Sequence, residues 1–149
     1  MKHFKWAAIA LVAISAPAFA SGLAIQPGLW QMTTKMTVTG GPSAFMPHNV
    51  KYKICLKKQA IEHPWNSLHG SSGKNGGCTF SNIKAGSHGA SWDMKCTGSS
   101  TSEGHTTLYV DSPVSMHEIQ DMTMKSSDMT MKFHAEGKAH RIGSCPAKK

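Results

Sequence analysis

Apolar and polar residues alternate along most of this chain, as they do in β-strands with one apolar face. The segment 28–39 places Trp30, Met32 and Met36 on one face and mainly polar residues on the other. The same period of two recurs in later segments that turn-forming residues separate: 49–56, 78–85, 90–96, 105–110, 114–125 and 128–142. The pattern therefore predicts about seven strands.

Most of the connections between these segments are short enough for hairpins, which favours antiparallel pairing of consecutive strands. We therefore expect a mainly β fold: a curved antiparallel meander, an open half-barrel or barrel-like, with a sandwich as the alternative. Between the second and third strands, Ile61, Trp65 and Leu68 are spaced by four and three residues, which predicts one short helix. Pro64 limits that helix to one or two turns or breaks it. The Gly-rich segment 70–77 lacks the spacing of a phosphate-binding loop and is interpreted as a linker.

A short repeat, Asp-Met-Thr-Met-Lys, occurs at 121–125 and again at 128–132. A turn at Ser126-Ser127 would place Lys125 opposite Asp128, Met124 opposite Met129 and Met122 opposite Met131. All four methionines then share one face. This face is either apolar core, because Met fills irregular gaps, or a Cu(I) site, because clustered thioethers select that ion. The metal alternative uses Met122, Met124, Met129 and Met131 as ligands.

The first 20 residues have the features of a secretory signal peptide. A positive start with Lys2 and Lys5 precedes an apolar run too short to span a bilayer, and Ala18-Phe19-Ala20 is an Ala-x-Ala cleavage site. Cleavage between Ala20 and Ser21 would leave a single domain, residues 21–149, without a transmembrane segment. We therefore expect a periplasmic or secreted protein.

The formal net charge is +8 at pH 7 and falls to +6 when Lys2 and Lys5 are removed. The lysines are scattered rather than clustered, which is typical of a soluble surface or of loose contact with anionic surfaces. No aromatic–basic motif suggests nucleic acid as a partner.

Four cysteines, an even number in an exported chain, predict two disulfides, with three possible pairings. Strand parity places Cys96 with Trp92 and Met94, and places Cys145 on the apolar face of the last strand. On this argument we expect Cys96–Cys145 and, by elimination, Cys55–Cys78. No Cys-x-x-Cys pair suggests zinc.

Motifs of catalysis are absent from the sequence: there is neither a Gly-x-Ser-x-Gly elbow nor a dinucleotide-binding Gly-x-Gly-x-x-Gly. Most of the eight carboxylates fall in turns or at outward-facing strand positions, so no acid/base pair is indicated. We expect no enzyme activity and no cofactor, apart from Cu(I) in the metal alternative.

Several short motifs occur in an order that resembles a known family of small exported bacterial proteins, domain-of-unknown-function family 3617 (DUF3617). The motifs are Pro27-Gly28-Leu29-Trp30, Cys55-Leu56, Trp92-Asp93-Met94-Lys95-Cys96, the Met-rich hairpin and Arg141-Ile142-Gly143-Ser144-Cys145. The resemblance implies a periplasmic setting and a mainly antiparallel β domain. It supplies no catalytic residues.

Three hypotheses of function follow. The favoured one is a non-catalytic binding or envelope-accessory domain that holds an apolar ligand, such as an acyl chain, on a Met- and Trp-rich sheet face. The second is the Cu(I)-binding protein, and the third is a structural module that contacts an envelope protein through an exposed strand edge. The ligand-facing residues of the first hypothesis are Trp30, Met32, Met36, Met94 and Phe133.

Overall fold

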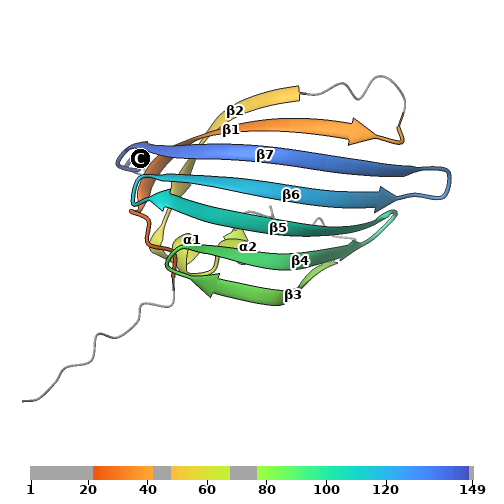
Figure 1. The fold of residues 1–149 in the computed structure, drawn as a ribbon, viewed down its shortest axis with the longest axis horizontal. Helices are drawn as coiled ribbons and strands as arrows, with labels where there is room; N and C mark the ends of the chain where they lie inside the picture. The colour runs from red at the N-terminus through yellow and green to blue at the C-terminus, as the bar shows by residue number, and fades with distance from the viewer. Residues whose placement is uncertain (1–21, 42–47, 68–76, 148–149) are drawn as a thin grey trace, which may run out of the picture.

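The computed structural model describes residues 22–41, 48–67 and 77–147, which form one seven-stranded antiparallel sheet and two short helices (Figure 1). The signal-peptide prediction and the linker prediction for residues 70–76 lie outside the described residues. The elements are β1 (Gly28–Thr39), β2 (His48–Leu56), α1 (Lys58–Glu62), α2 (Pro64–Ser67), β3 (Gly77–Gly86), β4 (Gly89–Thr97), β5 (Thr101–Ser112), β6 (Ser115–Lys125) and β7 (Thr130–Gly143).

The strand order across the sheet is β2-β1-β7-β6-β5-β4-β3. Strands β3 to β7 form consecutive hairpins, and β1 pairs with β7 as well as with β2. The sheet curves around one face, and its two edge strands, β2 and β3, are not hydrogen-bonded to each other (Figure 1). The predicted meander and its open half-barrel form are thus confirmed, and the sandwich alternative is wrong.

The helical segment is broken where the sequence predicted, because α1 ends at Glu62 and Pro64 begins α2. Proline has no N–H to donate and fits only the first turn of a helix. Ile61 of α1 is buried and joins the core of the concave face. The helices therefore fill part of the half-barrel from its open side.

The hydrophobic core lies toward one end of the concave face, where β1 begins and β7 ends. Trp30 is fully buried, and its indole N–H donates a hydrogen bond of 3.1 Å to the Gln26 carbonyl. Its neighbours across the strands are Ile54 and Arg141. The other buried core residues are Leu23, Ile25, Met32, Leu56, Ile61, Ala90, Trp92, Leu108, Met116 and Ala139.

Two disulfides are present, but the predicted pairing was wrong: the bridges are Cys55–Cys145 and Cys78–Cys96, not Cys96–Cys145 and Cys55–Cys78. Cys78 and Cys96 are direct partners in the β3–β4 hairpin. The parity argument failed for Cys145 because β7 ends at Gly143, after which alternation no longer determines the direction of a side chain. Cys145 instead reaches the end of β2 past the intervening strand β1.

The Met-rich hairpin forms, but the predicted register was wrong by two residues. Met124 lies opposite Met131, Met122 opposite Phe133 and Lys125 opposite Thr130. The turn takes in residues 126–129 rather than Ser126-Ser127 alone, and the Ser126 N–H donates to the Met129 carbonyl at 3.0 Å. A shift of two residues preserves the faces, so Met122, Met124 and Met131 still share the concave side.

The fifth strand is also longer than predicted, because β5 begins at Thr101 within the expected polar turn.

Candidate functional site

Short side chains on β7 leave space in the middle of the concave face. Ala135, Gly137 and Ala139 occupy consecutive concave positions of this strand, and all three are buried. Gly137 lies between Thr34 of β1 and Glu118 of β6. A Cβ atom at residue 137 would come within 2.7 Å of the Glu118 Cγ atom, far inside van der Waals contact. Glycine at this position therefore makes room for an inward-pointing glutamate.

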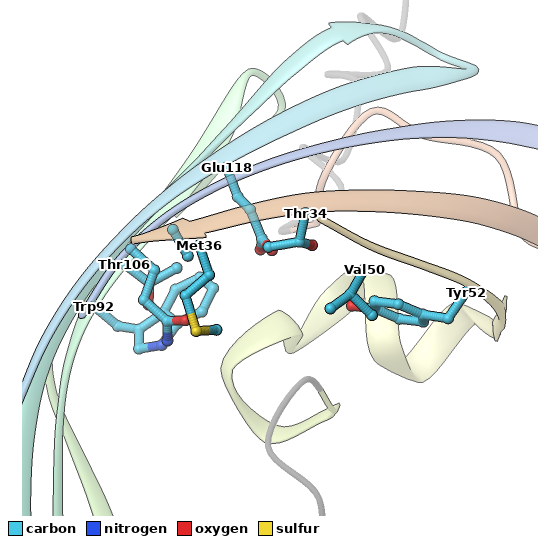
Figure 2. Close-up of a pocket in the computed structure, with 9 residues that line it drawn as sticks. Thr34, Met36, Val50, Tyr52, Trp92, Thr106 and Glu118 are labelled. Carbon is cyan, nitrogen blue, oxygen red and sulfur yellow. The ribbon is translucent and has the colours of Figure 1, made fainter. Parts of the chain in front are cut away.

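A pocket of about 250 Å³ opens around this glutamate, between the core and the Met-rich end of the sheet (Figure 2). Its wall combines apolar groups with hydroxyl, amide and carboxyl groups, and the lining residues come from six strands. Figure 2 shows Glu118 pointing toward Thr34, with Val50 and Tyr52 of β2 on one side and Met36, Thr106 and Trp92 on the other. The lining residues are Thr34, Met36, Val50, Tyr52, Trp92, Thr106, Glu118, Gln120 and Ala135.

Glu118 is the only carboxylate among the described lining residues, and burial raises its pKa above the usual value of 4.5. Within the described part of the chain, no hydrogen bond or ion pair is formed by its carboxylate. Burial, and secondly the negative charge of Glu118, raise the pKa of the Tyr52 hydroxyl, while a hydrogen bond with Thr34 lowers it. Glu118 is therefore the acidic group of this pocket, and it lies close enough to Tyr52 to affect the pKa of that hydroxyl.

Replacing Glu118 by glutamine is expected to stabilise the fold at neutral pH. The folded state holds the charged form less well than the unfolded chain does, because the pKa of Glu118 is raised. Its contribution to stability is most favourable below the unfolded pKa of 4.5 and is lost as the pH rises through the folded pKa. Urea denaturation should give Glu118→Gln the higher midpoint at about pH 7.5, with the difference shrinking toward about pH 4. A lower midpoint for the variant at pH 7.5 would contradict an uncompensated carboxylate.

The structure separates the five residues predicted to face a ligand. Trp30 and Met32 are buried in the core at 0% and 2% exposure, and Met94 is buried at 7%. Met36 lines the pocket, and Phe133 is half-buried on the same face, opposite Met122.

Sequence reasoning missed the polar part of the pocket, above all Glu118. The sequence nevertheless contains a signal for Glu118. This residue has the same parity as Met116 and Met122, so it belongs on the apolar face of its strand. The same parity with the apolar residues of their strands is found for Thr34, Thr106 and Gln120. Polar residues within an otherwise apolar face mark this site.

The residues of the metal alternative lie beyond the pocket, at the far end of the sheet. Met122, Met124 and Met131 are half-buried on the concave face, and Met129 is 39% exposed in the turn. Three of the four thioethers are therefore grouped on one surface, and the fourth lies at its border.

The convex face carries histidine–carboxylate pairs. The Nδ1 atoms of His105 and His134 lie 2.6 Å and 2.7 Å from the carboxylates of Asp93 and Asp121. Hydrogen bonds with Asp121 and Glu136 raise the pKa of His134. Among the described residues, no three His, Cys, Asp or Glu side chains are placed to hold a metal ion. These pairs are best understood as cross-strand contacts of an exposed sheet face.

The fold and the site define a class: a disulfide-bonded, open antiparallel half-barrel with a pocket of mixed polarity on its concave face. The family described as "Protein of unknown function (DUF3617)" matches residues 25–145, so the chain belongs to this family. No curated protein and no solved structure matches the chain. In the described segments, neither helix has the length and apolar character needed to cross a membrane.

Proposed function

We propose that this protein is a non-catalytic binding protein of the cell envelope that holds an amphipathic small molecule on its concave face. The polar group of the ligand lies in the pocket around Glu118. Its apolar part extends along the half-buried side chains toward the Met-rich end.

The observation that supports this proposal is the change in character along the concave face. Trp30 and Met32 belong to the closed core, whereas the next concave residues of β1, Thr34 and Met36, line the pocket. Farther along, the face is apolar but half-buried, with Phe133 opposite Met122 and Met131 opposite Met124. A pocket with a few polar groups that continues into an apolar surface suits an amphipathic ligand.

The disulfides support the cell-envelope setting. Two disulfides are consistent with an extracytoplasmic protein, because such bonds persist in oxidising compartments. Periplasmic location after cleavage between Ala20 and Ser21 is part of the proposal.

The chemistry of the pocket favours binding over catalysis. Among the described residues, its lining contains neither histidine nor cysteine, and its single carboxylate has no second acid or base of similar pKa beside it. Acid–base catalysis uses groups whose pKa values lie near the working pH and whose positions match the reacting atoms.

A neutral fluorescent probe, N-phenylnaphthylamine, tests the proposal. The wild-type protein should bind it with increased fluorescence, and Val50→Trp should weaken binding about tenfold or more, because the larger side chain fills the pocket from the edge strand. Asn49→Trp is the matched control, since Asn49 is exposed on the opposite face of the same strand. Absence of probe binding by the wild type, or equal binding by both variants, would contradict an apolar site in this pocket.

A second candidate, supported by the grouping of Met122, Met124 and Met131, is Cu(I) binding at the far end of the concave face. Titration against a chromophoric Cu(I) chelator measures it. Met124→Leu together with Met131→Leu should abolish binding, while Met36→Leu, in the pocket, should leave it intact. Leucine conserves volume, so a cost in stability below about 1.5 kcal/mol is expected for each site. Unchanged copper affinity in the double variant would remove this candidate.

A further inference from the structure

We propose that the pocket selects a ligand with a positively charged head group, an organic ammonium carried on an apolar chain, and that Glu118 is its counter-ion. This inference rests on the proposed function, because it specifies the ligand of the same pocket.

Within the described residues, Glu118 forms no ion pair with a positively charged side chain. Lysines of the strands around the pocket alternate to the convex face: Lys35, Lys51, Lys53, Lys125, Lys132 and Lys138. Arg141 has the concave register, but its Nε donates to the Pro27 carbonyl at 2.9 Å, at the core end of the sheet. A half-buried carboxylate without a partner costs free energy, and a bound cation would remove that cost.

Glycine at position 137 accommodates this carboxylate. Glu118 extends over Gly137, where any other residue would clash with its side chain. An apolar residue at position 118 would fill the face without leaving a buried charge. Glu118 and Gly137 together therefore place an acidic group on the concave face, although the stability of the fold does not require one there.

The wall around this carboxylate combines aromatic and apolar side chains. Tyr52 and Trp92 place aromatic rings in the same pocket, and Met36 and Val50 add apolar surface. Ammonium groups bind to aromatic rings through cation–π attraction, and their alkyl substituents pack on apolar side chains. A cavity of about 250 Å³ accommodates such a head group, with the chain leaving toward Phe133 and Met122.

The protein's overall charge does not produce this preference. The formal net charge of +6 at pH 7 that remains without Lys2 and Lys5 repels cations at long range, so tight binding of a cation would come from the pocket itself. An experiment that changes the charge of the ligand or the residue at position 118 therefore measures the pocket and not a nonspecific attraction of cations to the protein surface.

Isothermal titration calorimetry with three probes that share a decyl chain tests the inference: decyltrimethylammonium, decyl glucoside and decyl sulfate, each below its micelle concentration. The wild type should bind the ammonium probe about tenfold or more tightly than the glucoside, and the sulfate least. Glu118→Gln should remove the preference for the ammonium probe. Glu136→Gln is the control, because it removes the same charge from the convex face of the neighbouring strand and should preserve the preference.

Different results of this experiment would overturn the charge selection alone or the proposed function as well. Equal binding of the ammonium and glucoside probes by the wild type would overturn the charge selection and leave the proposed apolar binding intact. A preference that survives in Glu118→Gln, or that disappears in Glu136→Gln as well, would also overturn the role of Glu118. Absence of binding for all three probes would overturn both the inference and the proposed function.

Discussion

Replacing Cys55 and Cys145 together by serine is expected to lower the free energy of unfolding by about 4–5 kcal/mol. The bridge joins residues 90 apart in sequence, so it removes much of the freedom of the unfolded chain. It also ties the edge strand β2 to the segment after β7 across β1. Urea denaturation of the double variant, followed by circular dichroism, measures the loss. This loss is about a third or more of the roughly 5–15 kcal/mol by which native proteins are usually stable.

The second bridge provides the comparison for this result. Cys78–Cys96 closes a separation of 18 residues within one hairpin, so serine at both positions should cost only about 3 kcal/mol. A larger loss from Cys78 and Cys96 than from Cys55 and Cys145 would contradict loop closure as the main source of stabilisation.

Replacing Trp30 by alanine is expected to cost about 3–5 kcal/mol. The side chain is fully buried between β2 and β7, and its removal leaves a cavity that neighbouring strands cannot close without breaking their pairing. The same denaturation experiment measures this loss.

Trp30→Phe separates the volume of Trp30 from its hydrogen bond. Phenylalanine fills most of the space but cannot donate to the Gln26 carbonyl, so a cost of about 1–2 kcal/mol is expected. Equal costs for the alanine and phenylalanine variants would mean that the hydrogen bond to Gln26, rather than packing, is the main contribution of Trp30.

Strand periodicity predicted the sheet well because it is a local property. Alternation in residues 28–39 and 49–56 is set by which side chains face the core, and β1 and β2 follow those boundaries within a residue. Register and disulfide pairing depend on contacts between distant segments. The position of Met131 opposite Met124 depends on the length of a turn, which alternation does not encode.

The pocket was harder to predict than the sheet for a different reason. Its space arises from the absence of side-chain atoms at Gly137 and Ala135, and its charge from one residue on another strand, Glu118. Parity alone assigns Glu118 to the concave face, but a parity argument cannot distinguish a filled face from a hollow one. The depth of the pocket depends on which residues of β1, β6 and β7 become neighbours.

The connectivity of the two disulfides has a consequence for the biogenesis of the protein. The Cys78–Cys96 bridge lies, in sequence, wholly inside the segment that Cys55–Cys145 encloses, so the bridges are nested. Oxidation of the cysteines in the order in which they occur along the chain would join Cys55 to Cys78 and leave Cys96 for Cys145. A chain oxidised in this way reaches its native bridges only through thiol–disulfide exchange, in which a free thiolate attacks the wrong bond. Its yield in an oxidising compartment would then depend on a disulfide isomerase as well as on an oxidant.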